Sequence, residues 1–127
     1  MTSSTAAVRK TVTVLFCDLA GSTELGERLD PEALRTLMGR WYAAMRDPVE
    51  RHGGTVEKFV GDAVLAVFGV PQLHEDDALR AVRAAVEMRT ELARLNTELP
   101  GRRPRDLQIR IGINTGEIGR ASCRERV

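Results

Sequence analysis

The sequence predicts an α+β domain in which strands and two long helices follow one another in the order βαββαβ. The first observation is a predicted strand at Val12–Phe16, in which every residue is apolar or β-branched and which is followed closely by the carboxylate of Asp18. The second is a pair of short apolar runs separated only by Gly61-Asp62, the spacing of a two-residue β-hairpin. The third is a helical repeat of apolar residues behind each of two helix-start signals.

The composition is that of a soluble globular chain with one domain. Of the 127 residues, 43% are hydrophobic and 29% are charged. The net charge of +1 gives no electrostatic footprint for nucleic acid or an anionic membrane. The longest apolar run, at 63–70, is far shorter than the roughly 20 residues of a membrane span, and the N-terminus lacks a hydrophobic signal core. We therefore expect a cytoplasmic protein with no nucleic-acid partner and no direct membrane contact.

The first half of the chain is expected to hold a lead-in, one strand and one long helix. Residues 1–10 have the Ser, Thr and Ala content of a disordered lead-in. After the strand, Ser22–Leu29 is expected to form a short helical turn, and Asp30-Pro31-Glu32 starts the long helix. We expect Pro48 to kink or restart this helix and Gly53-Gly54 to end it. Its inward stripe is predicted as Leu34, Leu37 or Met38, Trp41, Ala44 or Met45, and Val49.

The second half begins with the hairpin strands Thr55–Val60 and Ala63–Phe68. The acidic run at 74–77 is interpreted as the charged start of a helix over Asp77–Glu98 rather than as a metal site. Arginines at 102, 103 and 105 are interpreted as a solvated connector, and Leu107–Asn114 alternates as a half-buried strand. The inward residues of the second helix are predicted as Ala78, Val82, Ala85, Met88 or the stem of Arg89, Leu92 and Leu95.

Folded with a right-handed crossover, these elements give a ferredoxin-like βαββαβ core, an antiparallel sheet with two helices packed on one face. We expect the first strand of the hairpin to lie beside the first strand of the chain, antiparallel to it. The end of the first strand and the hairpin turn then approach one another. Asp18 and Asp62 are therefore expected to converge, although they are 44 positions apart (62 minus 18) in sequence.

Asp18 on its own is readily explained as a turn or cap residue. A second carboxylate changes this interpretation, because two converging carboxylates repel one another unless a cation joins them. Hard oxygen ligands select Mg²⁺ or Mn²⁺ over zinc, and Mg²⁺ commonly takes one or two carboxylates together with substrate phosphates. The loop formed by Ala20, Gly21, Ser22 and Thr23 can present backbone N–H groups to those phosphates. The pattern predicts a nucleoside triphosphate site with two metal ions.

The segments VTVLFCDLAGST, HGGTVEKFVGDAVLAVFG, HEDDALRAVRAAVEM and RIGINTGE, in this order and spacing, resemble the class III nucleotide cyclase catalytic domain. The resemblance runs from about Arg9 to Glu117. It implies that Asp18 and Asp62 are catalytic and bind both metal ions, with the Leu19 carbonyl as an added ligand. It also places Lys58 at the position of the base-reading lysine.

The resemblance implies an adenylate cyclase, a phosphorus–oxygen lyase of cyclic-nucleotide signalling that converts ATP to 3′,5′-cyclic AMP and pyrophosphate. Lys58 agrees with this chemistry, because adenine N1 is an acceptor and wants a donor, whereas the guanine N1–H would prefer a carboxylate. The alternative for Lys58 is a solvated strand residue. The family further implies a head-to-tail homodimer with shared sites, in which the metal aspartates of one subunit work with the lysine of the other.

The chain departs from the family pattern at its end. Residues 118–127 resemble the in-frame translation of a sequencing adapter, so the catalytic domain is expected to span residues 11–117. The family's second base-reading residue, and an Asn and an Arg that stabilise the transition state, have no counterpart, so we expect this chain to be inactive alone. The alternatives are a catalytically silent nucleotide- and metal-binding dimerisation module, or a guanylate cyclase. A diguanylate cyclase is disfavoured because the hairpin turn lacks the GG-acid-acid-Phe pattern.

Overall fold

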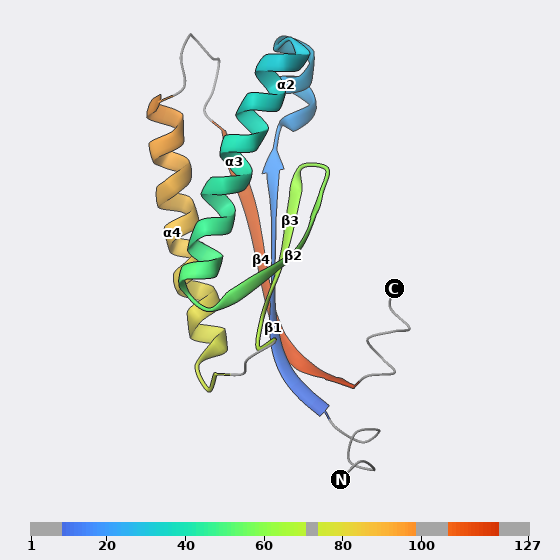
Figure 1. Ribbon diagram of the computed structural model, residues 1–127, viewed down its shortest axis with the longest axis vertical. Coiled ribbons are helices and arrows are strands. Elements are labelled where there is room, and N and C mark those ends of the chain that lie inside the picture. The colour runs from blue at the N-terminus through green and yellow to red at the C-terminus, as the bar shows by residue number, and fades with distance from the viewer. Residues whose placement is uncertain (1–8, 71–73, 99–106, 120–127) are drawn as a thin grey trace.

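The computed structural model describes residues 9–70, 74–98 and 107–119. The chain forms the elements in the predicted order, including the short helix expected after the first strand (Figure 1). The elements are β1 (Arg9–Ala20), α2 (Ser22–Arg28), α3 (Pro31–Arg51), β2 (Gly54–Val60), β3 (Ala63–Phe68), α4 (Asp77–Glu98) and β4 (Gln108–Gly119).

Within the described ranges, the strands form one antiparallel sheet in the order β2-β3-β1-β4, which confirms the ferredoxin-like topology. The prediction that the first hairpin strand lies beside β1 is wrong. β3, the second hairpin strand, pairs with β1, and β2 lies at the edge. The reason is directional: the crossover through α3 returns β2 parallel to β1, so only β3, reversed by the turn, can pair with β1 in the antiparallel sense.

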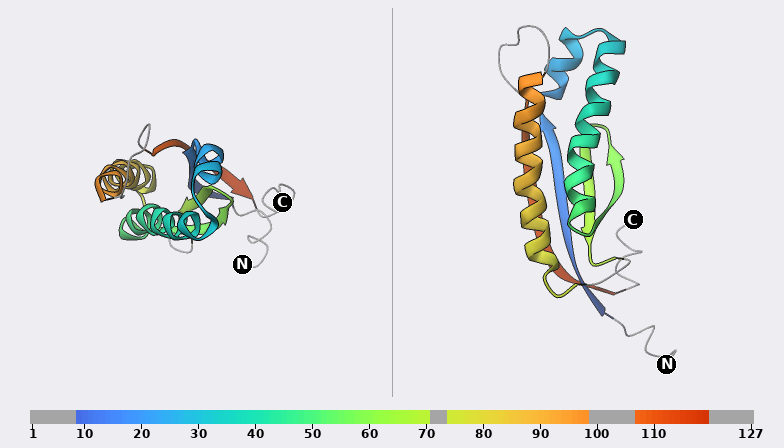
Figure 2. Two further views of the ribbon diagram at one scale, coloured as in Figure 1. Left: turned by 90° about the horizontal axis from the view of Figure 1, so that it is seen from above. Right: turned by 60° about the vertical axis from the view of Figure 1, so that its left-hand side comes forward.

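The helices α3 and α4 pack side by side on one face of the sheet (Figure 2). Trp41 of α3 is fully buried, as predicted, and Leu15, Cys17 and Leu19 of β1 point into the same core. Alternation along β1 therefore sends Phe16 and Asp18 to the opposite face, which no helix covers among the described elements. This uncovered face is called the open face below.

The long helix α3 begins and ends where its sequence predicts, because it starts at Pro31 and finishes at Arg51, just before the turn at Gly53. The side chain of Asp30 accepts a hydrogen bond from the backbone N–H of Ala33, and Pro31 occupies the first helical position. Of the kink or restart predicted at Pro48, the restart is wrong, because the helix continues through this residue to Arg51. Pro48 is itself buried. Its packing in the core holds the last turn together despite one missing backbone donor.

The helix α4 spans the predicted residues, but the first half of its inward stripe is displaced. Ala78 and Val82 are exposed. The buried side is formed instead by Asp77, Ala81, Ala84, Met88, Leu92 and Leu95. The apolar sequence of this helix offers two adjacent stripes, and the alanines at 81 and 84 let the backbone of α4 approach the sheet closely. The backbone N–H of His74 donates to the Asp77 carboxylate at 2.9 Å, the reciprocal half of a capping box, in agreement with a charged helix start.

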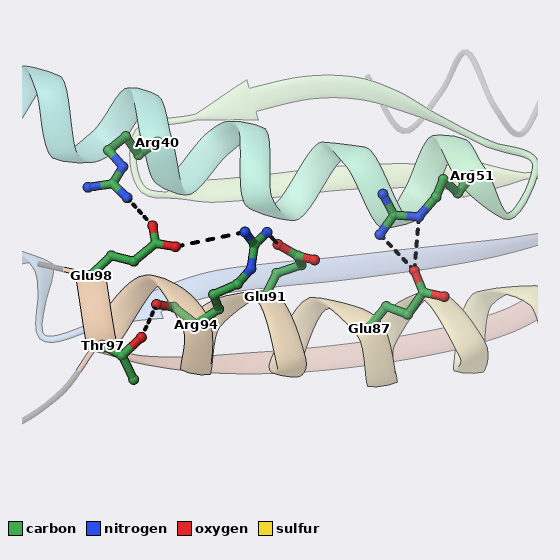
Figure 3. Close-up of polar contacts among 7 residues, drawn as sticks. All are labelled: Arg40, Arg51, Glu87, Glu91, Arg94, Thr97 and Glu98. Atoms are coloured by element: carbon green, nitrogen blue, oxygen red, sulfur yellow. Dashed lines mark hydrogen bonds and ion pairs between the residues drawn. The ribbon is translucent and has the colours of Figure 1, made fainter.

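Ion pairs join the outer edges of α3 and α4 (Figure 3). Arg40 pairs with Glu98 near one end of the seam, and Arg51 pairs with Glu87 at 2.8 Å near the other. Arg94, on α4, pairs with Glu91 and lies 3.8 Å from Glu98. Exposed pairs of this kind contribute about 0–1 kcal/mol each. The buried side chains, rather than these charges, therefore supply most of the stability of the helix layer.

Several boundary predictions need correction or fall outside the described residues. β1 starts at Arg9, so the last two residues of the predicted lead-in belong to the strand. β4 runs to Gly119, two residues into the predicted artefact tail. Residues 1–8, the arginine connector at 102–105 and the remainder of the tail, 120–127, lie outside the described residues. No helix among the residues that are described has both the length and the apolar character needed to cross a membrane.

Candidate functional site

Asp18 lies near the end of β1 on the open face of the sheet. Its cross-strand partners are Ala63 of β3 and Arg110 of β4. The Arg110 guanidinium reaches across the strand pair and places Nε 3.0 Å and Nη2 3.4 Å from the two carboxylate oxygens of Asp18. The Asp18 side chain is 21% exposed, so it is partly desolvated and still accessible from outside. A cation thus already faces this carboxylate.

Asp62 occupies the second position of the two-residue turn between β2 and β3. Gly61, before it, has a positive φ of 59°, a backbone conformation that favours glycine. The carbonyl of Asp62 accepts a hydrogen bond from the Leu19 N–H at 2.9 Å, and its carboxylate accepts one from the Ser22 hydroxyl. The turn is therefore bonded both to the end of β1 and to the start of α2.

The backbone brings Asp18 and Asp62 close together, through the pairing of β3 with β1 rather than through the predicted pairing of the first hairpin strand. Asp18 faces Ala63 directly, and Asp62 is the residue before Ala63. Opposed Cα atoms in antiparallel strands are about 4.5–5.5 Å apart, so the two aspartates are near neighbours. The donor set fits Mg²⁺ or Mn²⁺, because it offers carboxylate oxygen and no sulfur or imidazole. Among the described residues, no group of three or more His, Cys, Asp and Glu side chains is placed to hold a metal ion.

The loop after β1 turns sharply at Gly21 and leads directly into α2. Gly21 has a φ of 79°, which a residue with a side chain adopts only with strain. Its carbonyl accepts from the N–H of Leu25, so the helical pattern begins at once. Ser22 is committed to Asp62, whereas Thr23 is exposed. The structure thus brings the predicted phosphate loop against the turn that carries Asp62.

Lys58 lies on the same open face as Asp18, in the edge strand β2. It pairs with Leu65 of β3, which in turn pairs with Phe16 of β1. A register shift between Val56 and Lys58 makes this possible, because strict alternation from the inward-packing Val56 would turn Lys58 toward the helices. Two strand spacings and two residues separate Lys58 from Asp18, which corresponds to about 12 Å between their Cα atoms.

Two residues at this site were not predicted from the sequence. Arg110 pairs with Asp18, and the hydroxyl of Tyr42 on α3 donates to the carbonyl of Gly61 in the hairpin turn. Alternation could place Arg110 on the outer side of β4, but the β1–β4 register that sets it against Asp18 leaves no local signal. The contact of Tyr42 depends on how α3 lies across the hairpin, which sequence periodicity does not specify.

Cys17 is adjacent to Asp18 but faces the core. Burial, reinforced by the neighbouring Asp18 charge, raises the pKa of its thiol to about 12. Its Sγ lies 3.7 Å from the Met45 sulfur. Because only a thiolate acts as a nucleophile or metal ligand, Cys17 is a small core residue, as predicted.

Comparison with known proteins identifies a family. The model of the adenylate and guanylate cyclase catalytic domain matches residues 5–123. The uncharacterized protein Rv1318c of Mycobacterium tuberculosis is 38% identical over 120 residues, which cover 91% of this chain and 20% of that protein. The chain thus spans about a fifth of the length of this relative.

Solved structures share both the fold and much of the sequence. The adenylyl cyclase CyaB from P. aeruginosa is 38% identical, with a TM-score of 0.78, and the match covers 87% of this chain and 58% of that chain. The guanylyl cyclase Cya2 is 39% identical, with a TM-score of 0.77, and the match covers 87% of this chain and 56% of that chain. Similarity to an ATP-type and a GTP-type cyclase is therefore almost equal.

Proposed function

This chain belongs to the family of adenylate and guanylate cyclase catalytic domains, and we propose that it acts on ATP, forming 3′,5′-cyclic AMP and pyrophosphate. The observation that carries the proposal is the meeting of Asp18 and Asp62 at the end of β1, with Lys58 on the same open face. The activity is proposed for the protein of which this domain is a part.

Asp18 and Asp62 would hold two Mg²⁺ or Mn²⁺ ions, with the carbonyl of Leu19 as an additional oxygen ligand. The bound ions supply a Lewis acid for the phosphate oxygens. Two features support this role for the carboxylates. Asp18 already attracts a cation, the guanidinium of Arg110, and Asp62 is fixed by the Leu19 N–H and the Ser22 hydroxyl. Both carboxylates are therefore oriented before any ion arrives.

The loop of Ala20, Gly21, Ser22 and Thr23 would receive the triphosphate through its backbone N–H groups. Gly21 brings no side chain to the turn, so a phosphate can approach the backbone closely. The ribose 3′-oxygen then attacks the α-phosphate and pyrophosphate leaves. For such a transfer, the work of the protein is to align the reacting oxygen and to stabilise the charge that develops on the phosphate oxygens.

The choice of ATP over GTP rests on Lys58. Its ammonium group donates hydrogen bonds and accepts none, which suits the N1 acceptor of adenine. Overall similarity to CyaB and Cya2 is almost equal, so it gives no preference between the two nucleotides. A solved relative, the guanylate cyclase domain of RhGC from Catenaria anguillulae, is in complex with GTP, which supports a purine nucleoside triphosphate as the ligand class.

A second copy of the chain is proposed to cover the open face, in a head-to-tail homodimer with two shared sites. Phe16 is 44% exposed and Val60 is 56% exposed on this face, so large apolar side chains are available there for a partner to cover.

The test measures binding first and turnover second. Titration with Mn²⁺ and a non-cyclisable ATP analogue is expected to show binding that Asp18→Ala and Asp62→Ala each abolish. Binding that persists unchanged in both variants would refute the metal assignment. For turnover, residues 1–117 and the same residues followed by their genomic continuation are assayed with Mn²⁺ and either ATP or GTP, and comparable activity in the two would refute the expectation that the shorter chain is inactive.

Lys58→Glu in the extended chain separates base selection from catalysis. Replacing the donor with an acceptor leaves a buried base edge unpaired, which costs about 1–3 kcal/mol, or roughly 5- to 150-fold in relative use of ATP. The matched control is Arg46→Glu, which makes the same change of charge on α3, where Arg46 pairs with Asp47. An unchanged ATP-to-GTP preference in Lys58→Glu would make Lys58 a solvated strand residue.

A further inference from the structure

We propose that Tyr42 is a positioning residue for Asp62: its hydroxyl holds the hairpin turn against α3 and so sets the place of the Asp62 carboxylate. The inference rests on the proposed function, in which Asp62 is a metal ligand. The hydroxyl of Tyr42 donates to the carbonyl of Gly61, the residue immediately before Asp62. Tyr42 is 20 positions from Asp62 (62 minus 42) and lies on a different element.

The turn needs such support because it closes the outermost strand of the sheet. β2 is an edge strand that pairs only with β3 within the described ranges. Phe59, Val60 and Gly61 are all exposed as the strand approaches the turn. Strand ends with exposed backbone hydrogen bonds open at low free-energy cost. Any movement of the turn would carry Asp62 with it and change its distance from Asp18.

Three hydrogen bonds, each from a different element, converge on the Gly61-Asp62 dipeptide. The Leu19 N–H of β1 donates to the Asp62 carbonyl, the Ser22 hydroxyl of α2 donates to the Asp62 carboxylate, and the Tyr42 hydroxyl of α3 donates to the Gly61 carbonyl. The first two bonds hold the turn from the side of the phosphate loop. Tyr42 holds it from the helix layer, a direction that neither of the others covers.

Tyr42 is well placed to act as a rigid support. Its ring meets Phe59 edge-on, with centroids 4.5 Å apart, and lies 5.4 Å from the ring of Trp41. Trp41 is itself fully buried in the core. Aromatic contacts of this kind fix the ring, so the hydroxyl is presented with little loss of entropy. The ring of Tyr42 packs against its neighbours and its hydroxyl positions the turn, so the two roles can be separated by experiment.

The test uses Tyr42→Phe in the 127-residue chain, because this change removes the hydroxyl and keeps the ring. We expect Mn²⁺ to bind about two- to tenfold more weakly, the effect of one net hydrogen bond, with only a small decrease in melting temperature. Amide hydrogen exchange at Leu19 is expected to accelerate, because its N–H is bonded to the Asp62 carbonyl in the same turn. A purely packing role of the ring would leave both readouts unchanged.

Two further variants decide what a failure means. Arg40→Gln removes a tie from α3 to Glu98 of α4, away from the turn, and is expected to leave Mn²⁺ affinity and Leu19 exchange unaltered. Asp62→Asn tests the metal ligand itself, because undiminished Mn²⁺ binding in this variant would refute the metal assignment. In that case the amide exchange of Leu19 in Tyr42→Phe would be the measurement that decides whether Tyr42 positions the turn. If Asp62→Asn loses Mn²⁺ while Tyr42→Phe matches the unchanged chain in both readouts, the positioning role is overturned.

Discussion

Replacing Arg110 with Gln is expected to strengthen Mn²⁺ binding in the absence of nucleotide. Arg110 lies against both carboxylate oxygens of Asp18, at 3.0 and 3.4 Å, so an arriving metal ion must displace or share this partner. The Arg110 side chain is 75% exposed, which limits the value of the pair to about 0.2–1 kcal/mol. Removing that competition corresponds to a gain of about 1.4- to fivefold in affinity.

The assay is a Mn²⁺ titration that follows free Mn²⁺ by electron paramagnetic resonance, at low and at high salt. The gain should shrink near 1 M salt, where the screening length is about 3 Å. Arg46→Gln is the control, because it removes the same charge from a residue that pairs with Asp47 on α3. An Arg110→Gln chain that binds Mn²⁺ no better than the Arg46→Gln chain, while Asp18→Ala abolishes binding, would refute the competition.

Three other expectations concern the core and its edge. Trp41→Ala should lower the free energy of unfolding by about 3–5 kcal/mol, measured by urea denaturation with circular dichroism, because the ring is fully buried. Hydrogen bonds from His52 and then Arg51 hold the pKa of Glu87 below its ordinary value. The ionised Glu87 therefore stabilises the folded state above the unfolded-state pKa of about 4.3, and this stabilisation is lost as pH falls through the lower folded-state pKa. Glu87→Gln should reduce the dependence of the free energy of unfolding on pH in this acidic range. In a Cys123→Ser chain, the raised pKa of Cys17 predicts negligible reaction with a thiol reagent at pH about 8 until denaturant is added, and rapid labelling of the folded protein would contradict its burial.

Local chemistry in the sequence determined the elements. The cap at Asp30-Pro31 starts α3 where predicted, the two-residue turn at Gly61-Asp62 closes the hairpin, and α4 spans the predicted Asp77–Glu98. Each of these signals acts within a few residues, through a cap, a glycine at positive φ or a helical period. The convergence of Asp18 with Asp62 was expected from the order of elements, but it depends on β3 rather than β2 pairing with β1, because this pairing brings the hairpin turn to the end of β1.

Tertiary structure decided which neighbours those elements have. The inward stripe of α4 moved from Val82 to Ala81 and Ala84, and α3 continued through Pro48, because packing against the sheet outweighed local preference. The contacts of Arg110 with Asp18 and of Tyr42 with Gly61 depend on strand register and helix placement. Strand register and helix placement are set by how completely the apolar faces of all the elements are buried in the whole domain. This total burial cannot be predicted from a short stretch of sequence.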